Sequence, residues 1–280
     1  MAGSSMKDIK LRIKSIQSTM QITKAMQLVA SSKLRRAKER MELAAPYFDS
    51  FNEVIKNISC SSDTNGSVFF QKRNAEKICY CVIAGDRGLA GGYNNNVFKE
   101  VSEVCSKKNV QTTILPIGKK TVEFFKKRFN FVDEKYTVAA NVSIGDCFEI
   151  GKTLTEKFLN GDFDELYLTY TSYKSVLKQE VVSTRIFPLE SDFSAKKSQI
   201  SYEPSGGAAI RQIMPSYVAA YVYNALAQSY VCELTSRQNA MDTATSNADE
   251  MLSSLQLQYN RARQAGITQE ITEIVAGANS

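Results

Sequence analysis

The chain has 280 residues, of which 43% are hydrophobic, and its net charge is +6. This hydrophobic content is enough for a packed core and argues against wholesale disorder, while the length predicts one large or two ordinary domains. The sequence contains no His, which excludes hydrolytic triads of the Ser–His type and removes the commonest metal ligand. No run of about 18 apolar residues predicts a membrane span.

The cysteines indicate reduced, buried side chains rather than a metal site. No C-x-x-C pair occurs, so a zinc site is not expected. The sequence does not open with a secretory signal, and we expect the chain to stay in the compartment where it is made, with its thiols reduced. The six residues are Cys60, Cys79, Cys81, Cys105, Cys147 and Cys232.

The excess positive charge lies near the start of the chain. Residues 7–40 contain ten basic residues and only two acidic ones, Asp8 and Glu39, so this stretch carries +8 while the rest carries −2. Such an uneven distribution predicts a large acidic partner. From charge alone three interpretations stay open: a nucleic-acid surface, an acidic protein partner, or a merely solvated face.

Residues 5–59 are predicted to form one long helix, with Ser5 and Asp8 as its capping signal. Apolar residues recur with alternating spacings of three and four, first over residues 9–20 and, after a register shift, over residues 34–58. This is the seam pattern of a coiled coil. Pro46 is expected to kink the helix or to end its straight portion.

Residues 76–190 have the texture of an α/β domain, in which apolar strands alternate with short helices. The sequence predicts strands at 77–85, 110–118, 164–175 and 179–189, and helices at 95–108, 119–129 and 143–161. Polar linkers are predicted on both sides, at 60–69 and 191–207.

Residues 208–278 return to a helical period. Met241, Ala244, Ala248, Met251 and Leu255 again alternate three and four, and Pro215 is expected to kink or start the straight portion. Because the chain leaves and returns through the central domain, the two long helices must run antiparallel if they pair. The predicted fold class is therefore α/β with long helices: an antiparallel coiled coil of the N- and C-terminal helices plus a central, Rossmann-like α/β domain.

The segment 84–96, "AGDRGLAGGYNNN", follows a strand and precedes a helix, where backbone N–H groups could meet phosphate. Its glycines fit neither nucleotide-binding pattern, so a structural turn is favoured, with a partner-contact loop as another alternative. Asp162, Asp164 and Glu165 are interpreted as solvated loop residues. Without a catalytic constellation, the residues indicate a mechanical or scaffolding protein, not an enzyme.

Three segments resemble one known family. They are "QITKAMQLVASSKLRRAKERM" near the start, "GDRGLAGGYNNN" in the middle and "YNRARQAGITQEITEIVAGA" at the end. Together they are similar to the γ subunit of F-type ATP synthases, the central rotor shaft of that enzyme. The terminal stretch is the most specific, because Ile267, Thr268, Glu270, Glu273 and the pair Gly277–Ala278 match the family signature.

The resemblance implies roles for particular residues. Met26 is implied to face the C-terminal helix and a catalytic subunit, and Lys33 and Arg36 to contact an acidic loop of the catalytic subunits. Arg237, Gln264, Thr268 and Glu270 match polar positions involved in rotor–stator contact and coupling, although Gln238 and Asp242 depart from the family's pattern nearby. An apolar tip is implied to sit in a sleeve formed by other subunits; its residues are Ile271, Ile274, Val275, Ala276, Gly277 and Ala278.

The resemblance also implies partners and a location. The partners are the catalytic and non-catalytic subunits of the ATPase hexamer, the ε subunit and the membrane c-ring; a cofactor, nucleic acid and direct membrane insertion are not expected. The implied function is to transmit rotation of the c-ring to the hexamer, without catalysis by this chain. The expected location is the cytoplasmic face of a bacterial membrane, with a mature organelle form as the alternative. A nucleic-acid-binding or scaffolding coiled coil is the alternative function.

Overall fold

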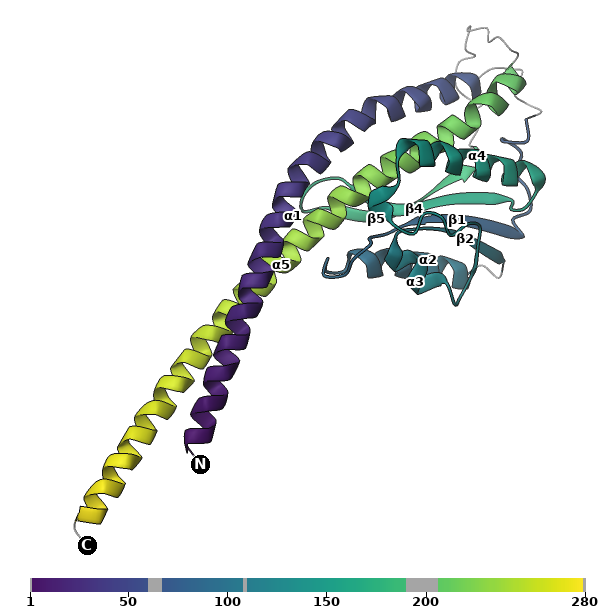
Figure 1. The fold of residues 1–280 in the computed structure, drawn as a ribbon. Coiled ribbons are helices and arrows are strands. Elements are labelled where there is room, and N and C mark those ends of the chain that lie inside the picture. The colour runs from purple at the N-terminus through teal and green to yellow at the C-terminus, as the bar shows by residue number, and fades with distance from the viewer. Residues whose placement is uncertain (1, 60–66, 108–109, 190–205, 279–280) are drawn as a thin grey trace. The chain divides into compact units, whose positions relative to one another are not determined.

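A computed structural model describes residues 2–59, 67–107, 110–189 and 206–278 of the chain (Figure 1). Two long helices dominate it, α1 (Ala2–Ser59) and α5 (Gly206–Ala278). The chain divides into two compact units, which we name by their content. The paired-helix unit consists of Met1–Ser32 and Arg237–Ser280, and the α/β unit is Lys33–Ser236.

The α/β unit contains a five-stranded sheet with the order β3-β2-β1-β4-β5. The first four strands of that order run parallel, and β5 pairs with β4 in the antiparallel direction. The strands are β1 (Lys77–Ile83), β2 (Gln111–Ile117), β3 (Asn130–Phe131), β4 (Glu165–Tyr173) and β5 (Gln179–Phe187). The four predicted strands are thus confirmed. The structure adds β3, which has only two residues and is too short to give a recognisable sequence pattern.

Helices cover both faces of this sheet (Figure 1). One face packs on α2 (Tyr93–Lys107) and α3 (Lys119–Phe125), and the other packs on α4 (Ile144–Asn160) and on parts of α1 and α5. The alternation of parallel strands with helices on both faces confirms the predicted Rossmann-like class. The helix expected over 119–129 is shorter than predicted, because α3 ends at Phe125.

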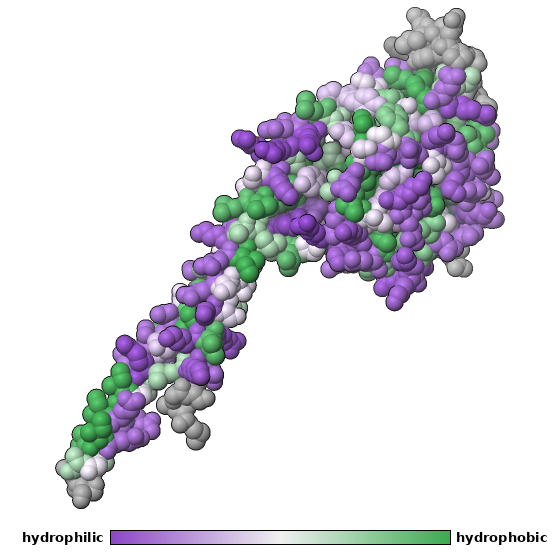
Figure 2. Space-filling view, viewed as in Figure 1, coloured by the Kyte–Doolittle hydropathy of each residue, from purple (hydrophilic) through white to green (hydrophobic). Residues whose placement is uncertain are grey.

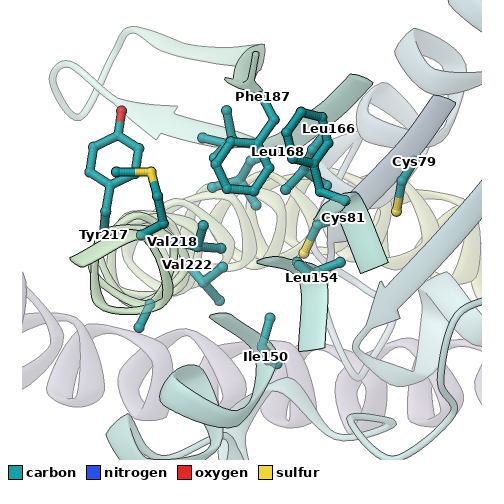
Figure 3. Close-up of a cluster of buried hydrophobic side chains, with 14 of the residues drawn as sticks. Cys79, Cys81, Ile150, Leu154, Leu166, Leu168, Phe187, Tyr217, Val218 and Val222 are labelled. Atoms are coloured by element: carbon teal, nitrogen blue, oxygen red, sulfur yellow. The ribbon is translucent and has the colours of Figure 1, made fainter. Parts of the chain in front are cut away.

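Strand β1 lies at the centre of the sheet and is buried on both faces after its first residue. Its alternate side chains sort into two cores, as the period of two requires. Cys79 and Cys81 face the core shared with α4 and α5, as Figure 3 shows, whereas Ile78 and Tyr80 face α2 and α3. An uninterrupted apolar run is typical of such a two-sided parallel strand.

Helix α4 begins and packs through identifiable residues. The Ser143 hydroxyl accepts a hydrogen bond from the Asp146 N–H, and the Asp146 side chain accepts one from the Ser143 N–H, which makes a capping box. One turn further on, Gly151 lies against α5: a Cβ at this position would stand 2.1 Å from the carbonyl oxygen of Pro215. Only a residue without a side chain allows the two backbones to approach so closely.

In the paired-helix unit, the less exposed residues of α1 recur without a register shift, which corrects the prediction. The inward positions run from Met6 through Met20 to Ala30 with alternating spacings of three and four, and polar Thr23 and Gln27 occupy two of them. The apolar pattern is interrupted at these two positions because both side chains form hydrogen bonds with residues of α5. Thr23 Oγ1 lies 2.8 Å from Thr245 Oγ1, and Gln27 Nε2 donates to Asp242 Oδ1 at 2.7 Å.

Two further predictions about the long helices are wrong in detail. Met251 is 57% exposed, and the inward position belongs to Leu252, which keeps the alternation between Ala248 and Leu255. Met251 is one residue away, about 100° around the helix, so it points outward. Ser5 is not the N-cap of α1, since the helix already begins at Ala2.

Both prolines lie inside their helices: α1 continues through Pro46 and α5 through Pro215. Of the predicted linkers, residues 60–66 and 191–205 lie outside the described residues. Among the helices of the described ranges, none is long and apolar enough to cross a membrane.

Candidate functional site: the α5 tip and the surfaces beside it

The C-terminal end of α5, residues 267–278, extends beyond its packing against α1; we call it the α5 tip. Gly266 is the last buried residue of the helix and faces Met6, whose Cε would lie 3.6 Å from an added Cβ. From Gly266 the helix continues for twelve residues to Ala278, about 18 Å at the rise of an α-helix. In Figure 1 this end of α5 passes the N-terminus of α1.

Large apolar side chains of the α5 tip are open to solvent. Ile267 is 47% exposed, Ile271 56%, Ile274 70% and Val275 54%. Their spacing of four, three and one places them on one flank of the helix, and Figure 2 shows the apolar surface there. The predicted tip residues Ala276, Gly277 and Ala278 are exposed as well. An exposed stripe of this kind on a helix is typical of a contact with another chain.

The apolar stripe does not continue the seam with α1. Continued from Tyr259, Ala262 and Gly266 with the same alternation, the seam reaches Gln269 and Glu273, which are polar and joined by a hydrogen bond of 2.9 Å between Gln269 Nε2 and Glu273 Oε1. The isoleucines are offset from this line by about 100–160° around the helix. The stripe is therefore a separate surface, and not an unpaired remainder of the coiled coil.

The other residues that the sequence indicated on α5 lie around this tip or far along the helix from it. Gln264, Thr268 and Glu270 are exposed. The Thr268 hydroxyl donates to the Gln264 carbonyl at 3.0 Å, so its hydrogen-bonding capacity is partly used inside the helix. Arg237 is half-buried at the other end of this part of α5.

On α1 the indicated residues fall in both units. Met26 is half-buried in the paired-helix unit, next in sequence to Gln27 of the polar pair. Lys33 and Arg36 are exposed in the α/β unit. Nearby, Arg35 and Glu39 are 3.9 Å apart with side chains 85% and 63% exposed, a geometry that contributes little to stability. The side chains of Lys33, Arg35 and Arg36 are thus open to a partner.

Sequence reasoning missed the two polar pairs that join the helices, Thr23 with Thr245 and Gln27 with Asp242. Counting heptads through the interruption would have found the α1 members, because Thr23 is seven residues after Ile16 and Gln27 seven after Met20. No sequence signal identifies their partners on α5.

The loop that follows β1 is held from several sides in the α/β unit. The Asp86 carboxylate accepts hydrogen bonds from the N–H groups of Lys119, Ala139 and Ala140 at 3.2, 2.8 and 3.1 Å. Asn94 Oδ1 accepts from the Gly85 N–H at 2.8 Å. A carboxylate of the protein therefore stands at the start of α3, where an external anion would otherwise be attracted. These contacts support the structural interpretation of residues 84–96.

The same loop presents Leu89 outward. Leu89 adopts a φ of 61° and is 65% exposed, and Gly91 also has a positive φ of 54°. Behind the loop, Tyr93 packs against Cys232 of α5. Burial, followed by the charge of Glu233, raises the pKa of Tyr93 well above its ordinary value. Tyr93 is therefore a neutral packing residue that anchors the loop.

The titratable groups of the core do not form a reactive set. Burial raises the pKa of the Cys79 and Cys147 thiols to about 12, and that of Cys81 is also well above its usual range. Such thiols are protonated and unreactive at neutral pH. Within the described residues, no group of three or more Cys, Asp or Glu side chains could hold a metal ion.

Comparison with known proteins assigns the family. The family model described as ATP synthase matches residues 5–280. The γ chain of the ATP synthase of Ruminococcus albus is 43% identical over 277 residues, covering 97% of this chain and 96% of the relative. The corresponding chain of Alkaliphilus metalliredigens is 41% identical, with 99% of each chain covered.

Solved structures show the same fold at lower identity. A chain from the rotor of the Euglena gracilis mitochondrial ATP synthase matches with a TM-score of 0.66 and 18% identity over 95% of this chain and 99% of its own length. A chain from the central stalk and c-ring of the Tetrahymena thermophila mitochondrial ATP synthase matches with a TM-score of 0.63 and 23% identity, over 80% of this chain and 99% of its own. The nearly complete coverage of the relatives carries the assignment: the chain belongs to the ATP synthase γ-chain family, and its function is that of a γ chain.

Proposed function

We propose that this γ chain is the rotor shaft of an F-type ATP synthase, which transmits rotation of a membrane c-ring to a catalytic hexamer. The observation that carries the proposal is the α5 tip, whose apolar stripe remains open in the isolated chain. Each isoleucine side chain gains about 1.5–3 kcal/mol when it is fully buried. A chain that leaves three isoleucines and one valine exposed on one helix end therefore has a strong reason to bury them in a partner.

The partner of the α5 tip is an apolar sleeve formed by the hexamer. The residues that we assign to this contact are Ile271, Ile274, Val275, Ala276, Gly277 and Ala278. Aliphatic contacts lack directional hydrogen bonds, so the helix can turn in the sleeve without one strongly favoured angle. A Lys or Arg side chain in the same place would be desolvated at a cost of several kcal/mol.

We assign the coupling contacts to residues of α1 and α5 outside the apolar stripe. We assign Lys33 and Arg36 to an acidic loop of the catalytic subunits, because both are exposed on the most basic part of the chain. Met26 and Arg237, which are half-buried, and Gln264, Thr268 and Glu270, which are exposed, complete the rotor–stator set. These contacts act by stabilising different conformations of the surrounding subunits to different degrees, which is what shifts their populations.

The α/β unit serves as the foot of the rotor and binds the c-ring and the ε subunit. The structural neighbours, which come from a rotor and from a central stalk with its c-ring, support this division. The chain itself contributes no catalytic group and binds no cofactor. We place it at the cytoplasmic face of a bacterial membrane, held there through the complex, because the curated relatives are bacterial.

A nucleic-acid-binding coiled coil was the alternative interpretation of the basic helix. The family assignment favours the acidic-protein interpretation. The domains that we propose from the sequence, residues 5–59, 76–190 and 208–278, follow the functional parts of the rotor rather than the two packing units.

Rotation in an assembled hexamer tests the proposal. The chain is assembled with the catalytic and non-catalytic subunits, the hexamer is immobilised, and a bead is attached to the α/β unit. We expect unidirectional turning of the bead during ATP hydrolysis and none with a non-hydrolysable nucleotide. A hexamer that hydrolyses ATP with a stationary bead contradicts the rotor function.

A further inference from the structure

The hairpin between β4 and β5 ends in a hydrogen-bonded turn, residues 174–178, which we call the hairpin knob. The N–H groups of Lys174 and Ser175 both donate to the Lys178 carbonyl, at 3.2 and 3.1 Å. The Lys178 N–H in turn donates to the Ser175 hydroxyl at 3.0 Å. These three bonds close the turn and leave Val176 and Leu177 at its two central positions.

Those two residues are unusual for a turn. Central turn positions favour Gly, Pro, Asn, Asp and Ser, whose backbones or short polar side chains suit the bend. Here the positions hold a β-branched Val and a Leu, which are 44% and 96% exposed. Neither residue belongs to the buried clusters of the sheet, and Leu177 is almost fully exposed. A local conflict between residue type and structure indicates a functional constraint.

Positive charge surrounds the knob. Lys174 and Lys178 flank the two apolar residues, and both are exposed. Lys178 Nζ lies 3.0 Å from Glu180 Oε1, and the Lys38 ammonium of α1 lies 5.5 Å from the ring centroid of Tyr173, where the hairpin begins. In Figure 1 this end of the hairpin lies beside α1. Lys38 of α1 thus adds a third positive charge near the base of the knob.

We propose that the hairpin knob docks on an acidic, amphipathic segment of a subunit of the hexamer. Leu177 and Val176 enter an apolar depression of that segment, and Lys174, Lys178 and Lys38 face its carboxylates. The proposal rests on the proposed rotor function and deepens it, because it adds a contact on the α/β unit to the contacts assigned on the long helices. The ordered turn means that little conformational entropy is lost when the knob binds.

Charge and size favour this occupant over two others. A second copy of the chain would bring one knob's lysines against another's in a symmetric contact, which like charges disfavour. A lipid surface would receive only two aliphatic side chains, which is far less apolar area than stable membrane anchoring needs. Complementary charge around an apolar anchor is, by contrast, a common pattern at protein interfaces.

The test compares Leu177→Ser with Ile144→Ser in the assembled hexamer. Ile144 is 50% exposed at the start of α4, so its variant removes an aliphatic side chain of similar size from the same unit but outside the knob. We expect Leu177→Ser to raise the dissociation constant of the chain from the hexamer about tenfold, and Ile144→Ser to leave it within twofold. Lys174→Glu should also weaken binding to the hexamer, and the dissociation constant of this variant should depend less on salt concentration.

A photo-reactive residue at position 177 then identifies the contact, and we expect the cross-link on an acidic segment of another subunit. Equal dissociation constants for Leu177→Ser and Ile144→Ser, or a cross-link to a second copy, overturn the inference alone. A lipid contact would also overturn the inference. It would be shown if the free chain sediments with anionic phosphatidylserine vesicles and the Leu177→Ser variant does not. If the unmodified chain fails to join the hexamer, it is the proposed rotor function that fails.

Discussion

Gln27 of α1 donates a hydrogen bond of 2.7 Å to the Asp242 carboxylate of α5, one turn away from the hydroxyl pair of Thr23 and Thr245. The two polar contacts interrupt an otherwise apolar seam. Because polar side chains in a seam must find matching partners, they specify which residues of two long helices face each other.

Replacing Asp242 with Ala should destabilise the paired helices by about 0.5–1.5 kcal/mol, the usual net contribution of one hydrogen bond. Chemical denaturation of the full chain measures the change. Asp249→Ala, one heptad further along α5 and also exposed, is the matched control and should stay within about 0.5 kcal/mol. The exchanged pair, Gln27→Asp with Asp242→Gln, should recover most of the loss, and a failure to recover would show that the contact is not specific.

Gly151 should tolerate no side chain. Its Cβ would stand 2.1 Å from the Pro215 oxygen and 3.1 Å from the Ala219 nitrogen, so Gly151→Ala must push α4 away from α5. We expect a loss of about 3 kcal/mol or more, at the upper end of overpacking effects. In Gly145→Ala, on the same helix, the added Cβ meets only the Ser143 hydroxyl at 3.5 Å and should be neutral or slightly stabilising. Similar midpoints of denaturation for the two variants would contradict the packing described.

Asp146 makes the start of α4 sensitive to acid. Hydrogen bonds from the Ser143 backbone and hydroxyl lower the pKa of the Asp146 carboxyl below its ordinary value of 3.8. A lowered pKa in the folded state stabilises the fold above the unfolded pKa, and this contribution disappears as the pH falls below about 4 through the folded pKa. Asp146→Asn should therefore cost stability at pH 6 and much less at pH 3. A cost independent of pH would show that the charge has no part in the cap.

The exposed stripe of the α5 tip predicts a separation of folding from assembly. Ile271 and Ile274 are 56% and 70% exposed, so changing both to Ser should leave the midpoint of denaturation of the free chain nearly unchanged. The same variant should bind the catalytic hexamer at least tenfold more weakly, because apolar area is no longer buried there. Gln269→Ala, on the polar line of the tip, is the control and should bind normally. Unaltered assembly of the isoleucine variant would remove the tip from the interface.

The fold was largely predictable from residue patterns. The apolar run of β1 and the alternation of strands with helices indicated a doubly covered parallel sheet, and the burial of Cys79 and Tyr80 on opposite faces bears this out. Local signals failed where a side chain's role depends on a partner distant in sequence. The lapse at Thr23 and Gln27 suggested a register shift, since nothing nearby shows that α5 offers Thr245 and Asp242 at the same level.

The candidate surfaces were predictable in part. The missing Lys and Arg after Arg263 and the periodic Ile residues indicated an apolar tip, because composition and helical period alone place these side chains on a flank. The sequence could not show which flank of the tip is free of contact with α1. That depends on the point at which the N-terminal part of α1 meets α5, beside Gly266. The predicted strands at 164–175 and 179–189 left residues 176–178 as the connection, but the sequence did not show that Leu177 would stand 96% exposed there.

By itself, the sequence determined the class of fold, the long paired helices, the basic face of α1 and the absence of histidine chemistry. Each of these follows from short-range period, composition or charge, which do not depend on folding. Only the tertiary structure decided that Gly151 packs against Pro215 and which apolar side chains stay exposed. It also decided that the Asp86 carboxylate bonds to the N–H groups of Lys119, at the start of α3, and of Ala139. These facts depend on the distance between residues that are far apart along the chain, and such distances exist only once the backbone has packed.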